Sequence, residues 1–101
     1  PASKQLEFTD LGSVPVVDGA IRLELREEKA ETTYLDQLSL RAEGIPLSLP
    51  AGETAALLEA DDGRYLVLVQ GEVQEFVLRL PLALSLQPAV RVTVEATGYY
   101  R

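Results

Sequence analysis

Apolar and polar residues alternate along several segments of this chain, which is the pattern of a strand with one buried face. Residues 20–26 are the clearest case, because Ile21, Leu23 and Leu25 point one way and charged residues point the other. Residues 89–97 show the same alternation, with Val90, Val92, Val94 and Ala96 as the buried set. Both segments predict antiparallel strands with one face on a core.

Weaker versions of the pattern predict further strands. Residues 82–86 continue the alternation past Pro81 as an edge strand or an extended connection. Residues 64–70 predict the most buried strand, which is apolar on both faces from Tyr65 to Val69. In residues 32–42 we expect Tyr34, Leu38 and Leu40 to share one face. The other predicted strands cover residues 5–9, 14–17, 45–50 and 73–80, the third of these as an edge strand because prolines bracket it.

Residues 54–60 have helical composition but are shorter than the ~12 residues that an isolated helix requires. We therefore expect a strand there that turns at residues 61–63, since an Asp-Gly pair supplies the positive φ of a tight hairpin. Residues 70–72 predict a second hairpin turn, and the polar residues 27–31 predict an exposed loop.

Seven to nine short strands predict an all-β fold, an antiparallel two-sheet β-sandwich of immunoglobulin-like or jelly-roll type. The 101 residues allow one domain, residues 1–101, and 47% of them are hydrophobic, which supplies a single core. Because the chain begins with Pro1 rather than Met, we expect it to be part of a larger protein.

Composition removes several classes of function. The chain has no His and no Cys, so it lacks the usual general base, the thiol nucleophile and the common zinc ligands. The net charge of −7 disfavours binding to the negatively charged backbone of nucleic acids. No apolar stretch of the sequence is long enough to cross a membrane. We expect no enzymatic activity, no catalytic residue, no cofactor, no metal, no nucleic-acid partner and no membrane insertion.

Three short stretches carry a resemblance. Residues 31–40 (ETTYLDQLSL) resemble a strand of β-sandwich accessory domains in secreted bacterial proteins, and residues 47–54 (LSLPAGET) are similar to a bend of immunoglobulin-like adhesion domains. Residues 62–65 (DGRY) are similar to a strand start in the same group. These three stretches together span 22 of the 101 residues. The resemblance implies a sandwich with an extracytoplasmic, non-enzymatic accessory role, at the cell surface or in the periplasm, but it does not identify a ligand.

Five residues are candidates for an interaction or ligand surface. Asp36 falls on a predicted apolar face, where a carboxylate either binds a cation or accepts backbone N–H groups from a neighbouring loop. Asp61 and Asp62, near Glu59, are either the start of a calcium site or a solvated turn. Tyr99 and Tyr100 either stack on a sugar or a partner domain, or divide between the core and the surface.

We therefore expect a structural or protein-interaction module of a larger, exported bacterial protein. Its partners would be neighbouring domains or another protein, and apolar strand surface predicts a homodimer as a further option. The alternative is a carbohydrate- or calcium-binding accessory module, although carbohydrate-binding families usually present Trp and this chain has none.

Overall fold

The computed structural model describes residues 5–59 and 63–101, with only the backbone described for residues 5–7. Over these residues seven strands form two antiparallel sheets, which confirms the predicted all-β, two-sheet architecture. In chain order the elements are β1 (Gln5–Pro15), β2 (Ala20–Arg26), β3 (Thr33–Ala42), β4 (Ile45–Leu47), α1 (Glu53–Leu58), β5 (Leu66–Leu68), β6 (Val73–Arg79), α2 (Leu82–Ser85) and β7 (Ala89–Tyr100).

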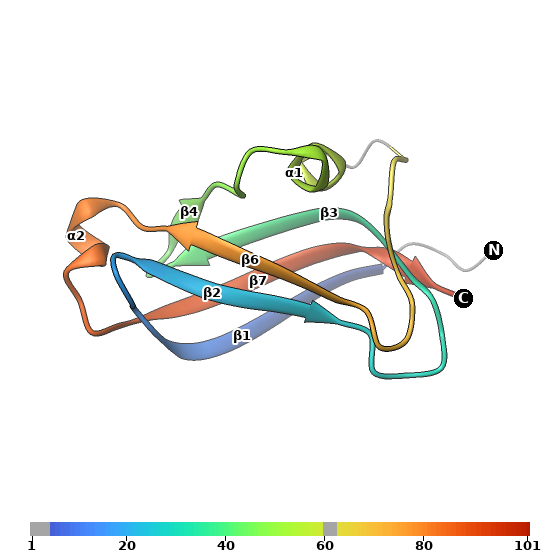
Figure 1. Cartoon of the computed structure of the whole chain (residues 1–101), viewed down its shortest axis with the longest axis horizontal. Helices are drawn as coiled ribbons and strands as arrows, with labels where there is room; N and C mark the ends of the chain where they lie inside the picture. The colour runs from blue at the N-terminus through green and yellow to red at the C-terminus, as the bar shows by residue number, and fades with distance from the viewer. Residues whose placement is uncertain (1–4, 60–62) are drawn as a thin grey trace.

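The two sheets are unequal in size. The larger sheet has the order β1-β7-β3-β4, and β5 also pairs with β3, at the opposite end from β4. The smaller sheet is the pair β2-β6. Figure 1 shows this pair crossing in front of the larger sheet, with α1 beside β3 and α2 at one end of the molecule. A sheet of two strands covers only part of the inner face of the larger sheet.

The core forms where the inner faces of the sheets meet. β2 contributes Ile21 and β6 contributes Phe76 and Leu78, all of them buried. From the larger sheet come alternate residues of β3 and β7, as the period of two requires: Leu38, Leu40, Ala42, Val90 and Val92. The alternation predicted for residues 20–26 and 89–97 is therefore confirmed. The two N-terminal segments are one strand, β1, with a bulge between Asp10 and Gly12.

The prediction that Tyr34 shares a face with Leu38 and Leu40 is wrong. The register between β3 and β7 shifts between Leu35 and Gln37, so Asp36 is an extra residue, and such a bulge reverses the faces of the strand. Thr33 and Leu35 accordingly face the interior, while the ring of Tyr34 stacks on Tyr99. A glycine is required opposite the bulge, because a Cβ on Gly98 would lie 2.2 Å from the carbonyl oxygen of Tyr34.

Two predicted extended segments are helices. Residues 54–60 do not begin a strand, because α1 occupies Glu53–Leu58 and buries Ala55 and Leu58 beside β3 and β5. Packing of these two side chains supports a helix that would be too short by itself. Residues 82–86 are not an edge strand, because α2 buries Leu84 and exposes Leu82 and Leu86.

The expected burial and pairing after α1 are also corrected. Residues 64–70 contain only the three-residue edge strand β5, and Val67 and Val69 are exposed rather than buried. The turn at residues 70–72 exists, but it joins β5 of one sheet to β6 of the other, so it closes no hairpin. The edge strand predicted from residue 45 is confirmed as β4, which ends at Leu47. The strand predicted from residue 73 is confirmed as β6.

The helix α1 provides a stability test. Leu58→Ala is expected to lower the free energy of unfolding by about 2–5 kcal/mol, because Leu58 is fully buried and its truncation leaves a cavity. Leu86→Ala, at a site that is 79% exposed, is the matched control and should change it by less than about 0.5 kcal/mol. Chemical denaturation measures both. Equal effects of the two variants would contradict the placement of α1 on the core.

Candidate functional site

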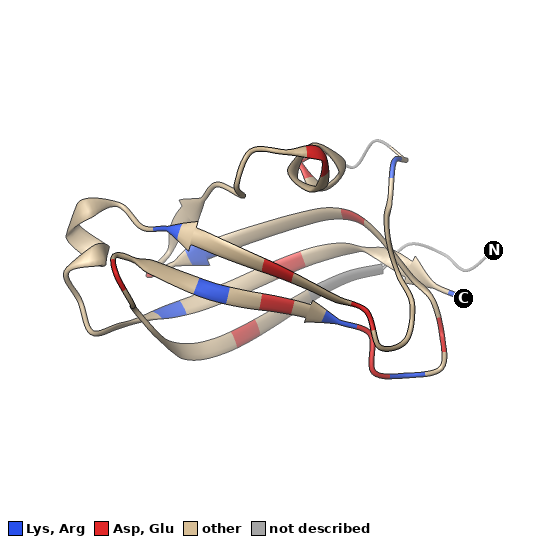
Figure 2. Cartoon of the chain, viewed as in Figure 1, with Lys and Arg blue, Asp and Glu red and all other residues tan. Residues whose placement is uncertain are grey.

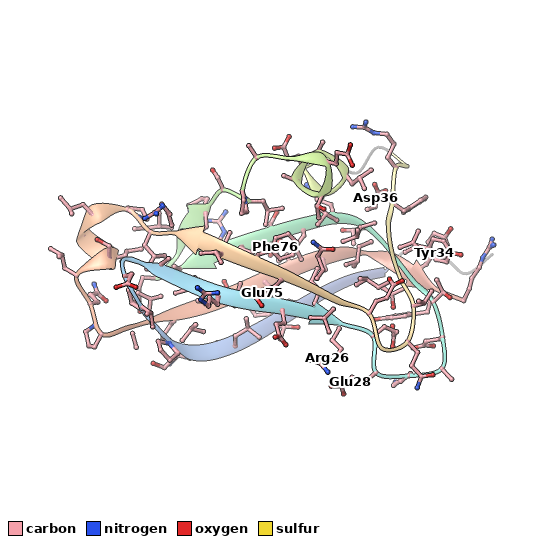
Figure 3. The ribbon with its side chains drawn as sticks, viewed as in Figure 1. Arg26, Glu28, Tyr34, Asp36, Glu75 and Phe76 are labelled. Carbon is pink, nitrogen blue, oxygen red and sulfur yellow. The ribbon has the colours of Figure 1, made fainter. Side chains whose placement is uncertain are left out.

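A cleft of about 650 Å³ lies between the two sheets, on the side of the small sheet that β2 forms. Its floor is the inner face of the larger sheet, and Phe76 of β6 and Leu68 of β5 also line it. The floor residues come from three strands, and most are apolar: Thr9, Leu11, Thr33, Leu35, Leu38, Leu40, Val94, Ala96 and Tyr100. Figure 3 shows Phe76 lying between the sheets. The volume and the apolar lining are in the range of protein ligand pockets.

The edge of β2 forms one wall of the cleft. Four successive residues of β2, Leu23 to Arg26, line it. Successive side chains of a strand point to opposite faces of the sheet. Inward-facing and outward-facing residues of one strand can therefore line the same cavity only if the cavity reaches the edge of that strand. The other strands contribute only their inward-facing residues. The cleft therefore opens beside β2.

The backbone of β2 presents hydrogen-bonding groups to this cleft. Gly19 accepts a hydrogen bond from the N–H of Leu80, next to β6, whereas Ala20 bonds with Val17 on the other side. Alternate residues of an antiparallel pair direct their N–H and C=O groups to opposite sides. Arg22, Glu24 and Arg26 therefore direct theirs away from β6. Within residues 5–59 and 63–101, β6 is the only strand that pairs with β2.

Charged residues form the rim of the cleft. The rim consists of four acids, Glu24, Glu27, Glu28 and Glu31, with the two bases Arg26 and Lys29. Figure 2 shows that acidic residues predominate in the loop that follows β2, and Figure 3 shows Arg26 and Glu28 projecting from this end of the strand. Arg26 pairs with Glu24 at 3.4 Å, both side chains about half exposed. The rim therefore carries more negative than positive charge.

Glu27 is buried, so the prediction of an exposed loop is wrong at this residue. Its carboxylate accepts hydrogen bonds from the hydroxyl of Thr33 and from the backbone N–H of Lys29, 3.0 Å away. These two hydrogen bonds, the one from Thr33 above all, hold the pKa of Glu27 below its usual value. The carboxylate thus fastens the loop to β3 beside the mouth of the cleft.

Asp36 lies apart from the cleft, in the bulge of β3 (Figure 3). It is completely buried, and its carboxylate accepts a hydrogen bond from the backbone N–H of Gly63, with both oxygens 3.2–3.3 Å from the nitrogen. This is the arrangement of the structural alternative, in which the carboxylate fixes a neighbouring loop. Asp61 and Asp62 lie outside the described residues, and no group of three metal-binding side chains occurs among the residues described.

The two C-terminal tyrosines point to opposite faces of β7. Tyr100 lines the cleft. Tyr99 stacks on Tyr34 with ring centroids 4.8 Å apart, Tyr65 meets both rings edge-on, and the guanidinium of Arg101 lies over them. This cluster closes the end of the β3-β7 pair with aromatic contacts.

The cleft itself was not predicted from the sequence. Leu11, the most exposed of the large apolar residues on the floor, is 43% exposed. In the sequence, Leu11 is a single apolar residue between the predicted strands of residues 5–9 and 14–17. No sequence signal places Leu11 in a cleft, and of the strongly apolar residues 65–69 only Leu68 lines it.

No family model matches this chain, and no curated protein and no solved structure was found to be similar to it. None of the helices in the described part of the chain is long and apolar enough to cross a membrane.

The hydrogen bonds of Glu27 predict a pH dependence of stability. Because its folded-state pKa lies below the usual value of 4.5, the ionised carboxylate stabilises the fold above that pH. The contribution is lost as the pH falls through the folded-state pKa. Near neutral pH the wild type is therefore expected to melt at a higher temperature than the Glu27→Gln variant. The difference between the two melting temperatures should shrink as the pH is lowered. Thermal melts from about pH 7 to about pH 3 measure it.

Asp10, whose pKa is also lowered, by the backbone N–H of Gly12 and by Arg91, affects both proteins equally and cancels in this comparison. Glu28→Gln, in the same loop, controls for the change in net charge. A difference between wild type and Glu27→Gln that stays constant through the acid range would show that Glu27 gains nothing from its hydrogen bonds.

A separate prediction concerns Asp36. Asp36→Ala is expected to lower the free energy of unfolding by about 1–3 kcal/mol, because the Gly63 N–H loses its acceptor. Asp36→Asn keeps one acceptor oxygen and should lose less. Thermal melts of the three proteins measure this, and an unchanged melting temperature in Asp36→Ala would refute the structural role.

Proposed function

We propose that this chain is a non-catalytic protein-interaction module that holds a polypeptide partner in the cleft between its sheets. The observation that carries the proposal is the edge of β2, which borders an apolar cleft with its backbone groups directed into it. A free strand edge is the site at which proteins recognise extended polypeptide backbone.

The distribution of polarity supports the same function. The centre of the cleft is apolar and its rim is charged, as in protein interfaces. Leu11 is exposed on the inner face of β1, where the fold has left apolar surface without cover. A partner that enters the cleft would bury this side chain.

The proposal includes the setting expected from the sequence. The module is part of a larger, exported bacterial protein, and its sandwich is of immunoglobulin-like or jelly-roll type. The support for this setting is the set of short resemblances at residues 31–40, 47–54 and 62–65. The partner is then a neighbouring domain or a separate protein.

Selection from a library of random linear peptides tests the proposal. Peptides enriched on the wild type are expected to bind it and to lose affinity by about tenfold or more for Leu11→Asp, which places a charge in the cleft. Phe8→Asp is the matched control, because Phe8 lies on the same strand, is 64% exposed and pairs with exposed Glu95 on the outer face.

Isothermal titration calorimetry measures the affinities, and melting temperatures verify that both variants fold. The proposal is wrong if no peptide is enriched, or if the enriched peptides bind Leu11→Asp as tightly as the wild type.

A further inference from the structure

We infer that the partner is an extended peptide segment that adds to the free edge of β2 as a third strand of the small sheet. Its apolar side chains, at alternate positions, fill the cleft, and a Lys or Arg lies at the end beside the loop of residues 27–31. The inference rests on the proposed function and specifies the mode and chemistry of binding.

The backbone of β2 fixes where the added strand would pair. Its exposed N–H and C=O groups are those of Arg22, Glu24 and Arg26, because Ala20 is already bonded to Val17. These three residues define an edge of about five residues, which is the length of an ordinary strand. Glu24 and Arg26 line the cleft, and Arg22 lies one residue before the part of β2 that lines it. The added backbone would satisfy groups that β2 directs away from β6.

The side chains next to this edge define the inner face of the partner. In a paired strand, residues opposite one another point to the same side of the sheet, so the added strand would direct alternate side chains inward beside Leu23 and Leu25. Below them lie Leu11 and Thr9 of β1, on the floor that β2 and β6 do not cover. An inward side chain must therefore be apolar, and the next one along the strand faces solvent.

The rim defines the charge of the partner. It holds four glutamates against one arginine and one lysine, and the net charge of the chain is −7. Glu28 and the partly buried Glu31 belong to the loop that follows β2, at one end of the free edge. A basic residue at that end of the peptide is attracted to them, whereas an acidic one is repelled.

The other strand edges fit this role less well. β6 also has an unpaired side among the described residues, but only its inward-facing Phe76 lines the cleft, so its edge does not border the cavity. The edge of β1 belongs to the larger sheet and contributes only Thr9 and Leu11, from its inner face. Of the described edges of β1, β2 and β6, that of β2 alone combines unpaired backbone groups with the apolar space of the cleft.

The test uses a peptide enriched by the selection above, in a series with one N-methylated position per peptide. N-methylation removes an N–H donor, so methyl groups at positions that face β2 are expected to weaken binding by about tenfold or more. Those at the intervening positions should have little effect, which gives a period of two. Hydrogen exchange of the Arg22, Glu24 and Arg26 amides should slow when the peptide binds.

The charge preference of the rim is tested by swapping charges between the peptide and the chain. Replacing the basic residue of the peptide by Glu is expected to weaken binding to the wild type, and Glu28→Lys should restore it. Glu95→Lys, at an exposed position of β7 on the outer face of the larger sheet, is the control for the same change of net charge and should not restore it.

The outcomes separate the two proposals. A peptide that is sensitive to Leu11→Asp, but whose N-methyl series shows no period of two, would overturn strand addition while the proposed function stands. Slow exchange of the β2 amides in a dimer of the chain alone would show that a second copy occupies the edge, and would also overturn it. If no peptide binds in the cleft, both the proposed function and strand addition are wrong.

Discussion

A two-stranded sheet packed on a larger one is the constraint on which this structure depends. The pair β2-β6 supplies Ile21, Phe76 and Leu78 to the core, and these side chains meet alternate residues of β3 and β7. Two strands are too few to cover the inner face of the larger sheet. The uncovered part is the cleft. Because the small sheet has only two strands, β2 lies at the side of the cleft.

The loop after β2 keeps the mouth of the cleft in place. Glu27 is held by Thr33 and Lys29, the backbone N–H of Gly71 donates to the carbonyl of Glu27, and the side chain of Gln70 donates to the carbonyl of Glu28. The loop is therefore tied both to β3 and to the turn before β6. An ordered rim reduces the conformational entropy that a partner must overcome on binding.

The sequence predicts the parts of the fold that depend on one strand at a time. Alternation identified β2 and β7, and it placed Asp36 against the interior. It missed the reversal of faces at Asp36, because that bulge depends on Gly98, which is distant in the sequence. The helix α1 was missed because the packing of Leu58, rather than local propensity, stabilises it.

The candidate site was less accessible to prediction than the fold. Glu27 is buried through a hydrogen bond to Thr33 that no sequence pattern signals, and the cleft exists because of which strands pair. Tyr99 and Tyr100 separate to two faces because they are adjacent on a strand, which the period of two does predict. What each face then contacts depends on the bulge in β3.

Amide hydrogen exchange of the free, monomeric chain tests the central claim most directly, since it reports which backbone groups of β2 are paired. The account predicts slow exchange at Ile21, Leu23 and Leu25, whose N–H groups face β6, and fast exchange at Arg22, Glu24 and Arg26. Slow exchange at all six amides would contradict it, because the edge of β2 would then already be paired and the cleft closed.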